Sequence, residues 1–114
     1  MADKPPKITE EEFSKNVIRV AQLCHWKVAH FRSVKIQRQD GSVYYATPVQ
    51  ADGAGFPDLL MMRDSRLVIA ELKSETGNTS ADQDAWIKGL RICDEPTVKL
   101  WKPSNWDDIV LELE

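Results

Sequence analysis

Hydrophobic and polar positions change their repeat several times along the chain. From Glu10 to Cys24 apolar residues recur at helical spacing, and Thr9 with Glu12 has the form of a capping box. This pattern predicts a helix over residues 10–24. Its apolar positions are Phe13, Val17, Val20, Ala21 and Cys24.

Alternation replaces the helical repeat after this segment. The stretch WKVAHFRSV (26–34) alternates apolar and polar residues, which predicts a half-buried strand. In KIQRQDGSVYYATP (35–48) Asp40 and Gly41 stand between two strand-like runs, which indicates a hairpin turn. We expect this hairpin to be inserted beside the core, and QADGAG (50–55) to form a loop because its residues are small and glycine-rich.

Two continuous apolar runs follow, Leu59–Met62 and Leu67–Leu72, with the turn RDSR between them. Continuous apolarity is typical of strands that are covered on both faces. We therefore expect the pair in the middle of a sheet with helices packed against it.

The last third of the chain predicts a helix and a strand. NTSADQDAWIKGLRIC (78–93) has Ser80 as N-cap and Gln83 at the capping-box position. Its expected apolar side is Ala81, Trp86, Leu90 and Cys93. TVKLWKP (97–103) predicts a strand ended by Pro103, and Ser104 with Asp107 could start a last helical turn. The order helix, strand, hairpin, strand, strand, helix, strand predicts a small α/β fold with a mixed sheet.

Length and composition limit the class of protein. At 114 residues the chain is one domain, and residues 1–8 are expected to form a flexible lead. No apolar run approaches the roughly 20 residues that span a bilayer, and the start MADKPPKITEEE has no apolar signal segment. We expect an intracellular protein without a membrane partner. Cys24 and Cys93 have no CxxC partner, which favours buried thiols in a reducing compartment.

Charge is unevenly distributed along the chain. The net charge of −3 does not by itself indicate a nucleic-acid binder. The segment from Phe13 to Gln39, however, has no acidic residue, and it could face phosphates or be a solvated basic face without a partner. Its basic residues are Lys15, Arg19, Lys27, Arg32, Lys35 and Arg38.

Carboxylates mark one end of the predicted hairpin. If RDSR closes the turn, Asp58 falls opposite Glu71 and Lys73, which project from one face of their strand while Leu72 points the other way. Two close carboxylates repel unless a proton or a cation lies between them. A hard divalent cation such as Mg²⁺ prefers such ligands, and an adjacent lysine can position or deprotonate a water, so the pattern predicts phosphodiester hydrolysis. The alternative is a strand whose Glu and Lys are merely solvated or paired.

The motifs GFPDLLMM, ELK and SADQDAW, in this order, resemble the VRR-NUC family of the PD-(D/E)xK nuclease superfamily. The resemblance spans about Glu10 to Trp101 and implies a restriction-endonuclease-like αβββαβ core. By position it implies that Asp58 and Glu71 bind Mg²⁺, for which Mn²⁺ can substitute, with the Leu72 carbonyl as a third ligand. Lys73 would orient or activate the attacking water.

Other residues are candidates with alternatives. Gln83 would reach back toward the site or simply cap its helix with Ser80. The superfamily often adds a glutamate from the first helix; helical spacing favours Glu10, since Glu12 is the capping-box residue and Glu11 points away. The remaining candidates are Arg32, Lys35 and Arg38 as DNA contacts and His30 as a packed strand residue rather than a catalyst. Cys24 and His25 are adjacent but have no second ligand pair nearby, which argues against a zinc site.

The predicted function is a Mg²⁺-dependent, structure-selective DNA endonuclease that leaves 5′-phosphate and 3′-hydroxyl ends. Stand-alone bacterial and phage members of the family resemble Holliday-junction resolvases that act as homodimers, which implies a four-way junction as substrate and the cytoplasm of a bacterial or phage-infected cell. Alternatives are a flap or nicking nuclease, a restriction-type enzyme, and a catalytically inactive DNA-binding module of the same fold.

Overall fold

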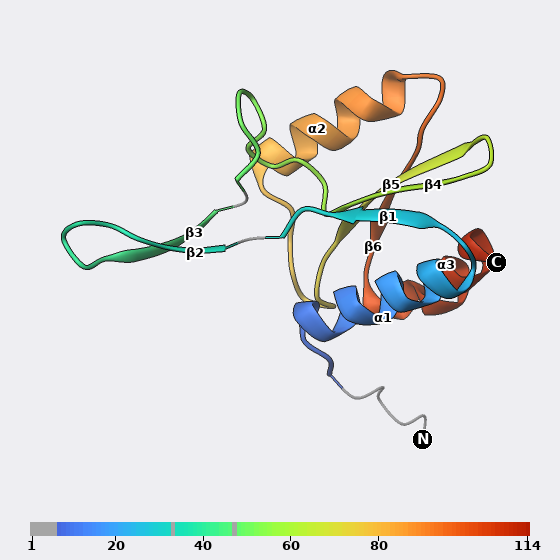
Figure 1. The fold of residues 1–114 in the computed structure, drawn as a ribbon, viewed down its shortest axis with the longest axis horizontal. Coiled ribbons are helices and arrows are strands. Elements are labelled where there is room, and N and C mark those ends of the chain that lie inside the picture. The colour runs from blue at the N-terminus through green and yellow to red at the C-terminus, as the bar shows by residue number, and fades with distance from the viewer. Residues whose placement is uncertain (1–6, 33, 47) are drawn as a thin grey trace.

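A four-stranded sheet in the order β1-β4-β5-β6 lies between helices (Figure 1). The structure, a computed structural model, describes residues 7–32, 34–46 and 48–114. Its elements are α1 (Glu10–Leu23), β1 (Lys27–His30), β2 (Val34–Gln37), β3 (Val43–Ala46), β4 (Leu59–Arg63), β5 (Arg66–Leu72), α2 (Ala81–Ile92), β6 (Thr97–Trp101), a 3₁₀ turn (Pro103–Asn105) and α3 (Trp106–Leu113).

The sheet is mixed, as expected. β1 pairs with β4 and β4 with β5 in antiparallel fashion, whereas β6 runs parallel to β5 after the crossover through α2. The chain therefore confirms the predicted α/β class and the predicted order of elements as far as β6. The paired apolar strands β4 and β5 occupy the centre of the sheet.

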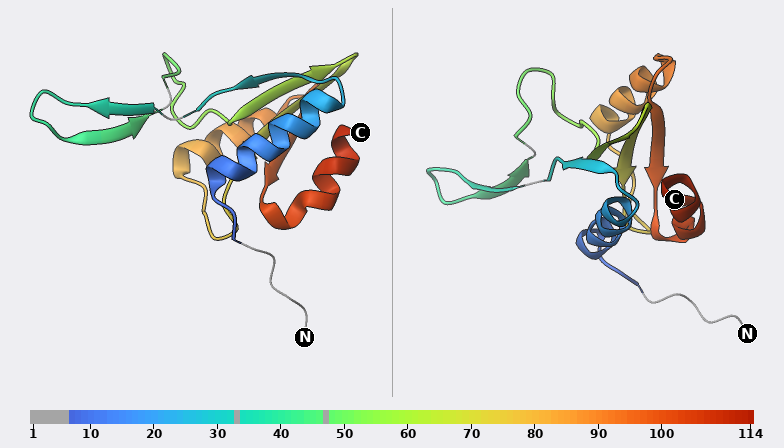
Figure 2. Two further views of the ribbon diagram at one scale, coloured as in Figure 1. Left: turned by 60° about the horizontal axis from the view of Figure 1, so that its bottom comes forward. Right: turned by 45° about the vertical axis from the view of Figure 1, so that its right-hand side comes forward.

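Helices cover both faces of the sheet. α1 and α3 lie on one face and α2 on the other (Figures 1 and 2). Alternate residues of β5 serve the two sides, since Val68, Ala70 and Leu72 join the core under α1 and α3 while Glu71 points to the opposite face. β5 is thus covered on both faces as predicted. β4 is not, because Met62 is 50% exposed.

Caps define both long helices. Thr9 Oγ1 accepts a hydrogen bond from the Glu12 amide at 3.1 Å, and α1 ends one residue earlier than expected. In α2 the predicted capping box forms between Ser80 and Gln83. The predicted apolar side of α2 is wrong at its ends, because Ala81 and Cys93 are exposed.

The apolar side of α2 is instead centred on a single buried residue, Ile87. Trp86 and Leu90 are only half-buried. Ile87 lies one full turn from Gln83, so the buried stripe runs from the site residue along the helix. Because Cys93 is exposed, the expectation of two buried thiols is also wrong.

Residues 34–46, here called the arm, form a hairpin of their own. β2 and β3 make a separate two-stranded sheet that projects away from the body (Figures 1 and 2). Gly41 has φ +87° at the turn, and the Asp40 carboxylate accepts a hydrogen bond from the Ser42 amide at 2.8 Å. The predicted insertion beside the core is confirmed.

Ile8 and the C-terminal segment pack against the core more than the sequence pattern indicated. The expected last helical turn is the longer helix α3, whose Ile109 and Leu113 are buried. Because Ile8 packs against the core, the predicted flexible lead is wrong at residue 8, and its residues 1–6 lie outside the described residues. Within the described ranges, every helix is too short or too polar to cross a membrane.

Candidate functional site

Several elements meet at one end of the sheet. The register pairs His30 with Leu59 and Leu59 with Ala70, so the residues one step further along, Asp58 and Glu71, come next to each other. The β5–β6 pairing ends nearby at Leu72. The predicted carboxylate pair therefore lies at the end of the sheet where β4 begins and β5 ends.

Asp58 is held from both neighbouring strands. Its Oδ2 accepts a hydrogen bond from the Leu72 amide at 2.8 Å, and its carbonyl accepts one from the Phe31 amide at 2.8 Å. Pro57, directly before it, is fully buried. These contacts fix the carboxylate relative to β1 and β5 at once.

Gly55 explains why the GFPD motif begins with glycine. Its φ is +81°, and an added Cβ would lie 2.5 Å from the Asp82 carbonyl carbon and 2.6 Å from the Gln83 nitrogen. The loop before Asp58 thus packs directly on the first turn of α2. Phe56 continues this contact, with edge-to-face packing against Phe31 and Trp86.

Glu71 is a buried carboxylate, with 1% of its surface exposed. Its Oε1 accepts a hydrogen bond from Gln83 Nε2 at 3.3 Å and lies 3.8 Å from Lys73 Nζ. Its Oε2 has no hydrogen-bond partner among the residues that the structure describes. One oxygen is therefore held while the other is left without a donor.

This environment raises the pKa of Glu71 from 4.5 to about 9. Burial is the largest cause, and the neighbouring Asp58 carboxylate raises the pKa further. Lys73 lowers the pKa and Glu10 raises it by smaller amounts. Without a cation, the two carboxylates accommodate each other by keeping a proton on Glu71.

Gln83 fulfils both of its alternative roles at once. Its Oε1 accepts a hydrogen bond from the Ser80 amide at 2.9 Å, which completes the capping box. Its Nε2 donates to Glu71. Because an amide has a donor end and an acceptor end, one side chain caps α2 and positions the site carboxylate.

Glu10, the predicted first-helix glutamate, lies beside Asp58. Burial raises its pKa, Lys73 lowers it, and Asp58 raises it, so its charge is felt by the same groups. It lines a hollow of about 310 Å³ with His30, Arg32 and Asp58. Glu11 also lines this hollow, which corrects the expectation that it points away.

The same hollow settles where the other candidates lie. Arg32 lines the hollow, whereas Lys35 and Arg38 belong to the arm, and the role of all three as DNA contacts stays a prediction. His30, expected to be packed in its strand, is exposed over much of its surface, and partial burial is the chief cause that lowers its pKa. Ser14 was missed, although its spacing four residues after Glu10 is the signal that could have found it.

The donor set fits a hard divalent cation in its chemistry. A carboxylate oxygen that lacks a donor, next to a second carboxylate, is the arrangement that a cation neutralises. In the part of the chain described, no three His, Cys, Asp or Glu side chains group around a common point. A cation here would therefore rest on Asp58 and Glu71, with backbone and water completing the ligands.

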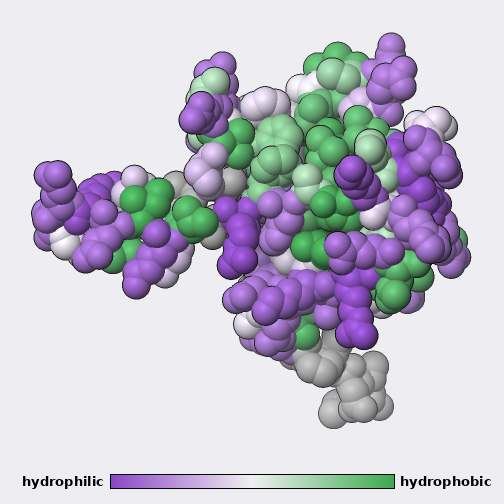
Figure 3. Space-filling view, in the orientation of Figure 1, coloured by the Kyte–Doolittle hydropathy of each residue, from purple (hydrophilic) through white to green (hydrophobic). Residues whose placement is uncertain are grey.

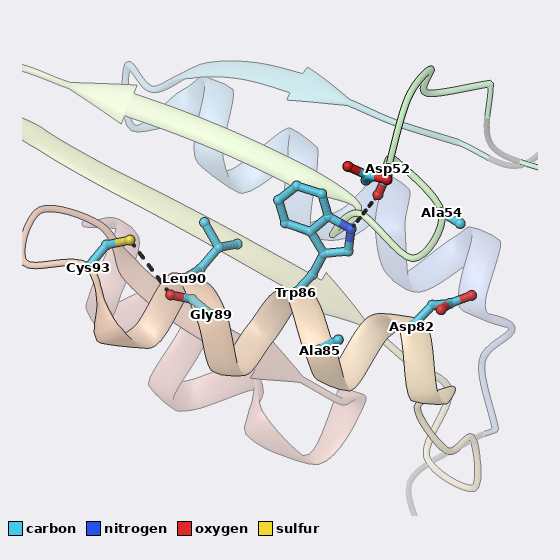
Figure 4. Close-up of a pocket in the computed structure, with 8 residues that line it drawn as sticks. All are labelled: Asp52, Ala54, Asp82, Ala85, Trp86, Gly89, Leu90 and Cys93. Carbon is cyan, nitrogen blue, oxygen red and sulfur yellow. Dashed lines mark hydrogen bonds between the residues drawn. The ribbon is translucent and has the colours of Figure 1, made fainter.

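A second hollow, of about 440 Å³, lies between α2 and the loop that holds Asp52 and Ala54 (Figure 4). Trp86 Nε1 donates to the Asp52 carbonyl at 3.1 Å across one end of it. The lining is largely apolar, with the carboxylates of Asp52 and Asp82 at its edge. None of the predicted site residues lines this hollow.

Compared with models of protein families, with curated proteins and with solved structures, the chain has no significant match. The resemblance to VRR-NUC proteins stays a prediction.

Proposed function

We propose that the protein is a Mg²⁺-dependent DNA endonuclease with a restriction-endonuclease-like core of the VRR-NUC type. One observation carries the proposal: Glu71 is buried beside Asp58 with one oxygen lacking a donor and a pKa of about 9. Strongly shifted carboxylates in clefts are more frequent at functional sites than elsewhere. The order α1, β1, β4, β5, α2, β6 supports the same core.

The proposed ligands are the carboxylates of Asp58 and Glu71 and the carbonyl of Leu72. Mg²⁺, or Mn²⁺ in its place, would polarise a phosphoryl oxygen and acidify a bound water. Leu72 already contributes its amide to Asp58, so the ligands are braced against each other. Gln83 keeps the Glu71 carboxylate oriented through Oε1.

The remaining side chains act on water and phosphate. Lys73 is only 14% exposed and lies 3.8 Å from Glu71 Oε1, where it could position or deprotonate the attacking water. Arg32 would grip a phosphate at the hollow. Glu10 faces the same groups and would add negative charge beside the ligands.

The proposed substrate is branched DNA, foremost a four-way junction, cut by a homodimer in the cytoplasm. Two cuts at symmetric positions need two sites, which a two-fold dimer supplies. A flap or nicking nuclease and a restriction-type enzyme would use the same site on other DNA. A catalytically inactive DNA-binding module would bind DNA and leave it uncut.

Cleavage of labelled DNA tests the proposal. Wild-type protein, Lys73→Ala and Asp58→Asn are incubated with a four-way junction, a flap and a linear duplex in Mg²⁺, in Mn²⁺ and in EDTA. We expect metal-dependent paired cuts in the junction, and a loss of at least ~100-fold in rate for both variants.

The matched control is Lys88→Ala, which removes an exposed lysine from α2 and should cut at the wild-type rate. Preference for the flap or the duplex would move the proposal to the corresponding nuclease type. Binding of every DNA without cleavage in either metal would reject the enzyme.

A further inference from the structure

The two faces of the arm carry different side chains. Residues paired directly across a hairpin share a face, so Lys35 lies beside Tyr45 on one face and Ile36 beside Tyr44 on the other. Gln37 and Val43 extend the first face toward the tip. We call this surface, formed by Lys35, Gln37, Val43 and Tyr45, the Tyr45 face.

The two neighbouring tyrosines differ in their environment. The guanidinium of Arg38 lies over the Tyr44 ring, 4.0 Å from its centroid. Tyr45, on the opposite face, is 71% exposed. A large ring that is open to solvent on a projecting hairpin is suited to contact with another molecule, whereas Tyr44 packs under Arg38 and is only 37% exposed. Figure 3 shows apolar residues of the arm surrounded by hydrophilic ones.

The charge of the arm favours an anionic partner. Lys35 and Arg38 are exposed, and Asp40, the acidic residue of the arm, has its pKa lowered by hydrogen bonds from Ser42 at the turn. The chain enters the arm just after Arg32, which lines the hollow beside Asp58. Basic side chains therefore occur at intervals from the proposed site out along the arm.

An open aromatic ring beside a lysine matches the chemistry of a nucleotide. A base stacks on the ring while the cation meets the phosphate. In paired DNA the faces of the bases are covered by their neighbours, so only an unpaired base can offer one. We propose that the Tyr45 face binds an unpaired nucleotide of DNA, next to the backbone held at the proposed nuclease site. This inference rests on the proposed function and adds how branched DNA is recognised.

Binding in EDTA separates this inference from catalysis. The probes are a fluorescent paired duplex and the same duplex interrupted by unpaired thymines, at one fixed salt concentration. We expect Tyr45→Ala to bind the interrupted duplex roughly tenfold more weakly than wild type and the paired duplex equally well. Tyr45→Phe keeps the ring and should bind both probes as wild type does.

Two further variants complete the design. Leu111→Ala removes an exposed apolar side chain from α3, 69% exposed, and should bind as wild type. Lys35→Gln should lower the affinity for both probes to a similar extent, because a phosphate contact does not depend on base pairing.

Equal affinity of wild type and Tyr45→Ala for both probes would overturn the inference, as would an equal loss on both. Sedimentation that shows a wild-type dimer split by Tyr45→Ala, with DNA affinity unchanged, would assign the arm to an interface between copies instead. If wild type cuts no DNA but Tyr45→Ala has a lower affinity for the interrupted duplex alone, the proposed function fails and binding of an unpaired nucleotide by the Tyr45 face stands. If wild type cuts DNA and Tyr45→Ala binds both probes with wild-type affinity, only the inference about the Tyr45 face fails.

Discussion

Two hairpins of similar sequence length have opposite environments in this molecule. The β4–β5 hairpin lies at the centre of the sheet; the Leu72 amide holds the Asp58 carboxylate, and Gln83 of α2 holds that of Glu71. The β2–β3 arm pairs only within itself and projects from the body. Burial fixes the carboxylates of the first hairpin, and exposure leaves the side chains of the second free to contact another molecule.

The difference shows how burial changes chemistry. Glu71, in the buried hairpin, has its pKa raised to about 9, mainly because water is excluded. Asp40, at the tip of the arm, has its pKa lowered by hydrogen bonds from Ser42. The same kind of group is thus kept protonated at the site and ionised at the tip.

Glycines near the two hairpins give the largest expected contrast. Gly55 and Gly41 both have positive φ, but a Cβ at Gly55 would collide with the backbone of α2 and one at Gly41 would meet nothing within 4 Å. We expect Gly55→Ala to lower the free energy of unfolding by more than ~3 kcal/mol, and Gly41→Ala by about 1 kcal/mol.

Urea denaturation of the two variants measures this contrast. The cost at Gly41 is conformational only, and the cost at Gly55 adds displacement of the first turn of α2. Equal losses would show that the close approach at Gly55 carries no energy beyond its φ.

Much of the fold followed from local patterns. The capping residues of α1 and α2, the turn at Asp40 and Gly41, and the apolar runs of β4 and β5 were all visible in sequence. Tertiary packing decided the rest. Met62 is exposed and Ile87 buried because of which elements lie nearby, and neither position is marked by the repeat alone.

The second contrast concerns pH and metal. Because the folded-state pKa of Glu71 is raised from 4.5 to about 9, the folded protein holds a proton that the unfolded chain releases. The stability this proton provides is complete below pH 4.5 and is lost as the pH rises toward about 9. In EDTA the melting temperature of wild type should therefore fall across this interval.

Glu71→Gln has no such proton to lose. Over the same interval its melting temperature should therefore fall by about 5 °C less than that of wild type. Mg²⁺ should raise the wild-type melting temperature most at the alkaline end, where it replaces the proton, and leave Glu71→Gln unchanged. Thermal melts with and without EDTA provide the measurement. Parallel pH curves for the two proteins would contradict the role of Glu71, and Asp40→Asn on the arm is the control expected to respond little.

The site was only partly visible in sequence. The spacing of Asp58, Glu71 and Lys73 predicted that they would meet, because register follows from a short turn. The choice of Glu10 depended on where α1 packs, and the double role of Gln83 depended on both ends of one amide finding partners. Such joint contacts arise from tertiary structure and have no local signature.

The smallest expected contrast separates the two roles of Gln83. Ser80→Ala removes the hydroxyl that caps α2 and should cost about 1 kcal/mol of stability without affecting metal affinity. Gln83→Ala should cost a similar amount, since the other half of the capping box is lost, and should also release Glu71 Oε1. A carboxylate that loses its orienting donor holds a metal less well, so the affinity for Mn²⁺, measured by calorimetry, should fall roughly tenfold. Equal metal affinity in the two variants would mean that Gln83 serves the helix alone, and that the buried hairpin orients Glu71 without help from α2.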